Sequence, residues 1–256
     1  MASCNILILG GTADARRLAE QLAGDPRIDA TLSLAGRTAQ PKAQPGRVRV
    51  GGFGGSEGLA RYLRDERIDI LVDATHPFAE RISANALAAA QAEGVPLIAL
   101  ERPVWQAQPG DQWIAARDAF HAASLLGEAP VTVFLSIGRQ NVAPFAAQAQ
   151  HRYIVRSVDP VAAEELPSGA SVILARGPFD IAAERQLLET HGVNIIVSKN
   201  SGGDATYAKI EAARALGLPV VMIERTPSAT ADPAHDVETV LGRIRHLAGL
   251  AAKRGE

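Results

Sequence analysis

The first apolar run of this chain is followed by a glycine turn that is typical of a phosphate-binding site. Residues 6–9 are all apolar, and the turn after them consists of Gly10, Gly11, Thr12 and Ala13. At a strand–turn–helix junction, free backbone N–H groups and the helix dipole point at one spot, where an anion can bind. The spacing Gly10-x-Thr12-x-x-Ala15 is a degenerate dinucleotide-binding pattern with threonine at the middle glycine, whose hydroxyl can itself donate to phosphate. The turn predicts nucleotide binding; a tight turn that binds nothing is the alternative.

A cation follows the second expected strand, at a position that selects between cofactors. Residues 30–34 are predicted to form that strand, and the residues after it are Ala35, Gly36, Arg37 and Thr38, with no acid among them. Sheets that bind NAD usually place a carboxylate here for the ribose 2′-hydroxyl, whereas an arginine suits the 2′-phosphate of NADP. We therefore predict NADPH as the cofactor, with these four residues among its contacts. An ordinary solvated role for Arg37 is the alternative.

Two further loops are expected to line the same cofactor. One is a second glycine loop at residues 51–55, from which Gly52 and Phe53 would contact it. The other follows the expected strand at residues 68–73 and contains Ala74, Thr75 and His76. In a dinucleotide-binding sheet the loop after this strand usually lies near the nicotinamide.

His76 is the first candidate for a proton donor in catalysis, and a bound water is its rival. An imidazole titrates near neutral pH, so it can donate a hydrogen bond or a proton beside a nicotinamide. Because Pro77 follows it, a histidine that only fixes the strand-to-helix turn is the alternative. Asp73 is predicted to accept hydrogen bonds from nearby backbone N–H groups rather than to act as an acid.

In the second half of the chain, polar and cationic residues again follow expected strands. Residues 198–203 combine Ser, Lys, Asn, Ser and two glycines, a composition that suits an anion. Lys199 is a second candidate catalytic residue, and the expected substrate contacts are Arg139, Arg176, Lys199, Asn200 and Ser201. Three cations at one edge predict a substrate with several carboxylates or phosphates. Scattered surface cations are the alternative.

The order of the expected elements places all these loops at one edge of a sheet. In the first half, strands are expected at residues 5–9, 30–34, 47–50, 68–73 and 95–100, and helices at 14–23, 57–65 and 79–93. This alternation predicts a parallel, doubly wound α/β sheet with its ligand at the C-terminal strand ends. Ser56 is the expected N-cap of the second helix.

The second half repeats the first. Strands are expected at residues 131–137, 153–156, 171–175, 194–197 and 219–223, and helices at 117–126 and 236–252. The strands at 194–197 and 219–223 begin and end a last βαβ unit. Residues 94–102 match residues 217–225 at an offset of 123, which aligns Thr75 and His76 with Ser198 and Lys199. We predict two Rossmann-like doubly wound lobes, 1–103 for the cofactor and 104–256 with the substrate loops and the C-terminal helix, and an active-site cleft between them. The alternative is that Gly-x-Pro before a strand is common to α/β units.

Composition limits the classes of function. The chain of 256 residues is 47% hydrophobic but only 4% aromatic, which is usual for parallel sheets covered by helices. A net charge of −2 argues against nucleic acid or an anionic membrane as partner. A single cysteine, Cys4, and histidines without metal spacing predict neither a disulfide nor a protein-held metal. Apolar runs stay short of 18 residues, so we expect a soluble, cytoplasmic protein.

Taken together, these loop sequences indicate a protein family more specifically than any one of them does. Six blocks occur in order: Ile8-Leu9-Gly10-Gly11-Thr12, Ser33-Leu34-Ala35-Gly36-Arg37, Val50-Gly51-Gly52-Phe53-Gly54-Gly55, Asp73-Ala74-Thr75-His76-Pro77-Phe78-Ala79, Glu101-Arg102-Pro103-Val104-Trp105 and Ser198-Lys199-Asn200-Ser201-Gly202. In these blocks the chain resembles the precorrin-6A reductases of cobalamin biosynthesis, from Ile6 to about Pro227.

The resemblance implies an NADPH-dependent oxidoreductase that reduces one double bond of the tetrapyrrole precorrin-6A to give precorrin-6B. A cobalt-containing counterpart in the family acts on cobalt-precorrin-6A, and the sequence leaves that choice open. Two other interpretations remain: an NADP-dependent reductase of another polyanionic small molecule, and a dinucleotide-sensing module without turnover. The oligomeric state is also open, with a monomer as one option.

Overall fold

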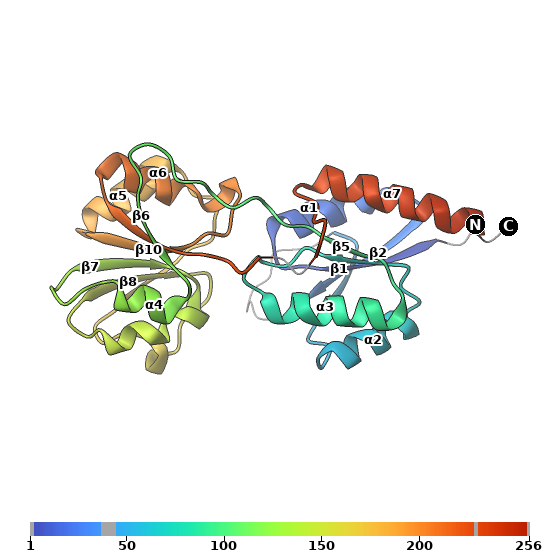
Figure 1. Cartoon of the computed structure of the whole chain (residues 1–256), viewed down its shortest axis with the longest axis horizontal. Coiled ribbons are helices and arrows are strands. Elements are labelled where there is room, and N and C mark those ends of the chain that lie inside the picture. The colour runs from blue at the N-terminus through green and yellow to red at the C-terminus, as the bar shows by residue number, and fades with distance from the viewer. Residues whose placement is uncertain (1–2, 37–44, 228–229, 255–256) are drawn as a thin grey trace. The chain divides into compact units, whose positions relative to one another are not determined.

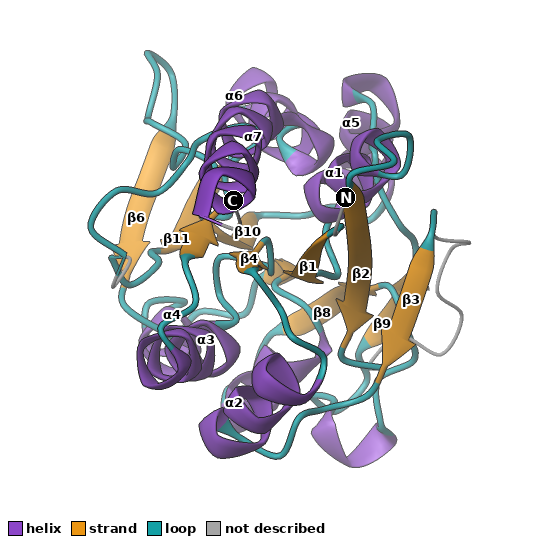
Figure 2. Cartoon of the chain, turned by 90° about the vertical axis from the view of Figure 1, so that its right-hand side faces the viewer, coloured by secondary structure: helices purple, strands orange, loops and turns teal. Residues whose placement is uncertain are grey.

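The computed structural model describes residues 3–36, 45–227 and 230–254, and the chain divides into two compact units (Figure 1). The first lobe comprises Met1–Arg102 and Thr226–Glu256, and the second comprises Pro103–Arg225. Each lobe is an α/β unit with a parallel sheet, and helices lie on both sides of the strands (Figure 2). The predicted fold class of two parallel-sheet lobes is confirmed. The cleft between the lobes stays a prediction.

The first lobe has five strands in the order β3-β2-β1-β4-β5. These are β1 (Cys4–Leu9), β2 (Ile28–Leu34), β3 (Arg47–Val50), β4 (Ile70–Asp73) and β5 (Leu97–Ala99). The helices α1 (Ala13–Leu22) and α7 (Val237–Arg254) cover one face, and α2 (Ser56–Asp65) and α3 (Glu80–Glu93) the other (Figure 1). The central strand is buried on both sides, because Ile6 and Ile8 pack with the first helix pair and Leu7 and Leu9 with the second.

The C-terminal helix belongs to the first lobe, which corrects the predicted assignment to the second. Its buried residues Val237, Val240, Leu241 and Ile244 form one apolar stripe. They share a core cluster with Ile6 of β1, and α7 lies beside α1 (Figure 1). The chain therefore returns to the first sheet after it has completed the second.

The second lobe has six strands in the order β6-β11-β10-β7-β8-β9. They are β6 (Gln112–Ala116), β7 (Thr132–Ser136), β8 (Arg152–Ser157), β9 (Ser171–Leu174), β10 (Ile195–Lys199) and β11 (Pro219–Ile223). The helices α5 (Ile181–Thr190) and α6 (Ala208–Leu216) cover one face, and α4 (Ala119–Ser124) lies on the other (Figure 1). Short 3-10 helices occupy Arg139–Asn141, Ala143–Ala147, Ala163–Glu165 and Asp204–Thr206.

The topologies of the two lobes show the repeat that the sequence predicts. Strands β1 to β5 and β7 to β11 follow the same spatial order, so that the third strand of each set lies at an edge. Each sheet is extended at one edge by a segment that enters from the other lobe in the sequence. In the first lobe the segment around Ala234 lies beside the end of β5, and in the second β6 lies beside β11. The Glu101 N–H donates to the Ala234 carbonyl oxygen, and the Glu224 N–H donates to that of Ala116, both at 2.8 Å.

The helix after each of these exchanged segments begins in the same way. Asp118 caps α4 by accepting from the His121 N–H, and Asp236 accepts from the Thr239 N–H at the start of α7, both at 2.7 Å. This exchange explains why a single division near residue 103 misplaces the C-terminal helix.

Several local predictions differ from the structure. Strand β6 and helix α5 were not predicted, whereas α6 lies where the last βαβ unit was expected. The N-cap of α2 is Gly55 at φ 94°, not Ser56, which is the first helical residue. Glycine is favoured at this φ because a residue with an L side chain would be strained there.

Candidate functional site

The two glycines after β1 are required for different physical reasons. The Gly10 N–H donates to the Ser33 carbonyl oxygen at 2.9 Å, and a Cβ on Gly10 would lie 2.6 Å from Leu32 Cδ1. Gly10 therefore permits close packing against the neighbouring strand. Gly11 has φ 115°, and a Cβ there would have no atom within 4 Å. Its role is conformational, and it leaves open space at the N-terminus of α1, where an anion is favoured.

Thr12 joins the turn to the neighbouring strand end. It is the N-cap of α1, and its Oγ1 accepts from the Ala15 N–H at 3.1 Å. The same hydroxyl donates to the Ala74 carbonyl oxygen at 2.8 Å, directly after β4. The expected donation from this hydroxyl to phosphate is therefore not what the structure shows, because its proton is used within the protein. The Ala13 and Asp14 N–H groups, which precede the capped Ala15 N–H, are the donors of the first helical turn that could face an anion.

Asp14 places a negative charge in the first turn of α1, and the sequence alone did not indicate how it is compensated. The Asp14 carboxylate forms an ion pair with Arg102, which follows β5, at a distance of 3.3 Å. It also lies 3.5 Å from Arg17. These two cations reduce the repulsion that Asp14 would exert on a phosphate at this end of the helix.

Arg49 organises the second glycine loop, a role that sequence reasoning missed. Its guanidinium donates to the carbonyl oxygens of Gly51 at 2.6 Å and Gly52 at 2.8 Å, and to Ser33 Oγ at 3.2 Å. Its Cζ also lies 3.8 Å from the centre of the Phe53 ring. Arg49 thus holds the loop predicted to contact the cofactor in one conformation. An arginine two residues before a Gly-Gly pair was the available signal.

The loop after β4 consists of two successive side-chain turns. The Asp73 carboxylate accepts from the Thr75 N–H at 3.1 Å and from its hydroxyl at 2.7 Å, which confirms the predicted structural role of Asp73. His76 Nδ1 accepts from the Phe78 N–H at 3.2 Å. In the neutral ring the proton is then on Nε2. His76 fixes its turn through one nitrogen, and the other is the one that can donate.

The predicted cofactor residues of the first lobe lie at the C-terminal edge of its sheet. Gly10, Gly11, Thr12 and Ala13 follow β1; Ala35 and Gly36 follow β2; Gly52 and Phe53 follow β3; and Ala74, Thr75 and His76 follow β4. Arg37 and Thr38 lie outside the described residues.

The predicted substrate residues of the second lobe also lie at one sheet edge. Lys199 ends β10, and Arg139 lies in the short helix after the adjacent strand β7. Arg176 follows β9, two strands further along the sheet. Ser201 is buried in the loop after β10, where its N–H donates to the Lys199 carbonyl oxygen at 2.9 Å.

Asn200 holds a neighbouring segment rather than projecting into solvent. Its side-chain oxygen accepts from the Trp105 N–H at 2.8 Å, and its amide nitrogen donates to the Trp105 carbonyl oxygen at 3.1 Å. The indole N–H of Trp105 donates to the Gly203 carbonyl oxygen at 2.9 Å. We therefore expect Asn200 to shape the loop at residues 198–203, which differs from the direct substrate contact predicted for it.

Three charged side chains are buried beneath this edge of the second sheet. Arg156, Glu184 and Lys209 are 5%, 2% and 2% exposed, and Arg156 forms an ion pair with Glu184. Lys209 Nζ donates to the Thr206 carbonyl oxygen at 2.6 Å. Burial, with a smaller contribution from the positive charge of Arg156, lowers the pKa of Lys209 to about 7.

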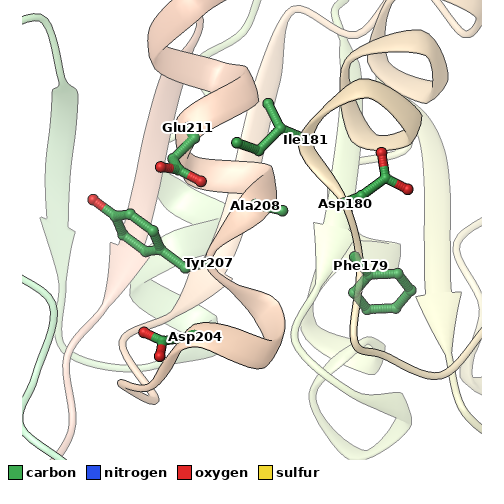
Figure 3. A pocket seen from close by; sticks show the side chains of 7 residues that line it. All are labelled: Phe179, Asp180, Ile181, Asp204, Tyr207, Ala208 and Glu211. Atoms are coloured by element: carbon green, nitrogen blue, oxygen red, sulfur yellow. The ribbon is translucent and has the colours of Figure 1, made fainter.

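A cavity of about 450 Å³ lies between the N-terminal ends of α5 and α6 (Figure 3). Its lining residues are Phe179, Asp180, Ile181, Asp204, Tyr207, Ala208 and Glu211. Three of these are carboxylates, so the cavity does not suit a polyanionic ligand. The cations predicted to bind substrate are not among the lining residues.

The part of the chain that the structure describes has neither a metal-binding cluster nor a membrane-spanning helix. There, no group of three or more His, Cys, Asp and Glu side chains could hold a metal ion. None of the described helices combines the length and apolar character needed to cross a membrane.

Comparison with known proteins places these loops in a family context. The model of the family "Precorrin-6x reductase CbiJ/CobK" matches residues 5–245. A precorrin-6A reductase from Sinorhizobium sp is 52% identical, over 96% of this chain and 94% of the relative. One from Rhodococcus erythropolis is 46% identical, over 97% and 99%. A solved structure of a CobK precorrin-6A reductase is 44% identical and superposes with a TM-score of 0.90, over 95% of this chain and 97% of the other.

The Thr12 hydroxyl is expected to stabilise the first lobe. In a Thr12→Val variant, the N-cap acceptor and the donor to Ala74 are both lost, so the free energy of unfolding should fall by about 1 to 2 kcal/mol. Thr12→Ser keeps the hydroxyl and should stay within about 0.5 kcal/mol of the wild type. Urea unfolding measures both variants. Loss of stability in Thr12→Ser with wild-type stability in Thr12→Val would show that the methyl group, not the hydroxyl, matters.

Proposed function

Because this chain belongs to the precorrin-6x reductase family, we propose that it reduces one double bond of precorrin-6A with NADPH, giving precorrin-6B in cobalamin biosynthesis. The observation that carries the proposal is the similarity to precorrin-6A reductases over nearly the whole length of both chains. Reductases of this family need a reduced nucleotide cofactor in general. The choice of NADPH and the assignment of residues are our inferences.

The proposal for the cofactor rests on the first lobe. Gly11 opens the N-terminus of α1, and the ion pair of Asp14 with Arg102 reduces repulsion of a pyrophosphate there. The pyrophosphate would be held by Gly10, Gly11, Thr12 and Ala13. The adenosine ribose with its 2′-phosphate would be held by Ala35, Gly36, Arg37 and Thr38. The remaining part of the cofactor would contact Gly52, Phe53, Ala74, Thr75 and His76. These residue types fit the cofactor because glycines admit close approach of backbone N–H groups, and an arginine at the end of the second strand suits NADP.

The proposal for the substrate rests on the second lobe. Precorrin-6A carries many carboxylates, and Arg139, Arg176 and Lys199 all follow or end strands of one parallel sheet. Their charges would bind the macrocycle and orient it, with Asn200 and Ser201 shaping the loop that carries Lys199.

When bound, the nicotinamide supplies the hydride; the protein supplies position and a proton. The first lobe would hold the dinucleotide through the backbone of its glycine turns, and the second would hold the carboxylates. Orientation of both reactants, with exclusion of water, is the main contribution expected of such a protein. As an imidazolium, His76 would donate the Nε2 proton at the carbon next to the one that accepts the hydride and return to a neutral ring. Protonation of Nδ1 in that state replaces the hydrogen bond that it accepts from the Phe78 N–H in the neutral ring. Lys199 is the second candidate for this role.

The activity is tested directly by anaerobic oxidation of NADPH. Purified protein should oxidise NADPH only when precorrin-6A is present, one equivalent for each precorrin-6B formed, as followed at 340 nm and by mass spectrometry of the product. Cobalt-precorrin-6A in a parallel reaction tests the substrate choice. Binding of NADPH without turnover of either macrocycle would instead indicate a dinucleotide sensor.

Cofactor selection is expected to depend on Arg37. Arg37→Ala removes the cation proposed to face the 2′-phosphate, so the KM for NADPH should rise at least tenfold while the KM for NADH changes little. Arg27→Ala removes a cation that pairs with Asp25 in the turn before β2, at the opposite end of that strand, and serves as the control. Equal effects of Arg37→Ala on the two cofactors would contradict the assignment.

The two roles of His76 can be separated by His76→Asn. The asparagine side-chain oxygen can still accept from the N–H two residues ahead, so the turn is kept, but the Nε2 donor is lost. We expect kcat to fall at least tenfold with unchanged affinity for NADPH, and His76→Ala to lose the turn as well. If kcat of His76→Asn equals that of the wild type, His76 has only a structural role.

A further inference from the structure

The buried charges of the second lobe lie at the edge where its loops emerge. Arg156 is the penultimate residue of β8, Glu184 lies in the first turn of α5, and Lys209 is the second residue of α6. In a parallel sheet covered by helices, the C-terminal ends of strands and the N-terminal ends of the following helices meet at one edge. The three side chains, which we call the buried triad, therefore lie beneath the loops that carry Arg176 and Lys199.

The ion pair of the triad supports the Arg176 loop. The Arg156 guanidinium lies 3.9 Å from the centre of the Phe179 ring, three residues after Arg176, and 4.9 Å from that of Phe134. It also donates to Ser136 Oγ at 3.3 Å, at the end of β7 and three residues before Arg139. Stacking of a guanidinium on an aromatic face is stronger when both are removed from water. Arg156 thus touches the ends of two loops with predicted substrate cations.

Lys209 supports the Lys199 loop. Its Nζ bonds to the Thr206 carbonyl oxygen and lies 4.8 Å from the centre of the Trp105 ring. Trp105 is in turn held by Asn200 and Gly203. The two loops are also joined directly, because the Phe179 N–H donates to the Ala205 carbonyl oxygen at 3.2 Å. One connected set of contacts therefore runs from Phe179 to Asn200.

The first lobe has no counterpart to this lysine at the same place. At the offset of 123 residues, Ala212 and Ala213 of α6 correspond to Ala89 and Ala90 of α3, and all four are buried. Lys209 corresponds to Ala86, which is fully buried in the core of the first lobe. An apolar residue thus satisfies this packing position, and burial of a lysine costs stability. Packing alone does not account for the charge.

We propose that Arg156, Glu184 and Lys209 are positioning residues that hold the loops carrying Arg139, Arg176 and Lys199 in the geometry that binds the anionic macrocycle. This inference rests on the proposed function for its ligand. The triad acts on KM for the macrocycle through the loops.

Replacing the ion pair by apolar residues separates positioning from stability. Exchange of a buried ion pair for apolar side chains of similar size is often neutral or stabilising. Arg156→Met with Glu184→Leu should therefore fold with unchanged stability yet release Phe179 and Ser136. We expect KM for precorrin-6A to rise about tenfold, with kcat and the Kd for NADPH unchanged. Lys209→Met should have the same effect through Thr206 and Trp105.

The control is a second ion pair in the same lobe. Arg185 pairs with Glu189 at 3.0 Å on α5, and both side chains are about half exposed. Arg185→Met with Glu189→Leu should leave KM for precorrin-6A within twofold of the wild type.

Hydrogen–deuterium exchange, measured by mass spectrometry, gives a readout that does not need turnover. Amides in residues 175–179 and 199–207 should exchange at least tenfold faster in the triad variants, while those of β1 and β4 keep wild-type rates. Unchanged exchange in both loops, or an unchanged KM with active enzyme, would overturn the positioning role. If wild-type protein fails to turn over precorrin-6A but the loops respond as expected, the proposed function fails and the positioning role stands.

Discussion

Parallel strand pairing is the constraint on which the rest of this structure depends. In the first lobe, Leu9 of β1 lies beside Ser33 of β2 and Asp73 of β4, so the three strands end at the same level. Every crossover helix must then start at that edge, which gathers glycine turns, caps and free N–H groups within one small region. Residues more than 60 positions apart, such as Thr12 and Ala74, become hydrogen-bond partners there. The second sheet applies the same rule to a different set of side chains.

Much of the fold follows from local sequence pattern, and the exceptions have physical causes. The predicted strands at residues 47–50 and 219–223 coincide with β3 and β11, because apolar or β-branched residues there are bounded by clear turns. Strand β6 was missed since it lies at an edge, where Ile114 is exposed and the apolar run is short. The C-terminal helix was expected as a helix but assigned to the wrong lobe. Its amphipathic pattern shows that one face is buried, and does not show which sheet buries it.

The candidate site was predictable where function resides in the chain's own turns, and less so where it depends on distant partners. Gly11 acts through its positive φ, and Asp73 accepts from the N–H of Thr75, two residues later. Both roles are local and can be expected from the sequence. The polar side chain of Asn200 in a strand-end loop suggested a contact with a ligand. Its hydrogen-bond partner, Trp105, lies 95 residues away, and the sequence does not show that the two meet. Arg156, Glu184 and Lys209 are of types that are usually exposed, so nothing in the sequence indicates that they are buried together.

Under the proposed assignment, the two lobes adapt one topology to two ligands. In the first, the sheet edge is shaped by glycines and by hydroxyl and carboxylate caps, so that backbone donors face outward and the core beneath stays apolar, with Ala86 in α3. In the second, the equivalent helix has Lys209, and Arg139, Arg176 and Lys199 lie at the ends of strands or in the segments after them. Backbone donors are rigid because the helix holds them, whereas long cationic side chains must be ordered at a cost in entropy. In the role proposed for them, Arg156, Glu184 and Lys209 would order these loops in advance and so reduce the cost of binding a flexible, multiply charged macrocycle.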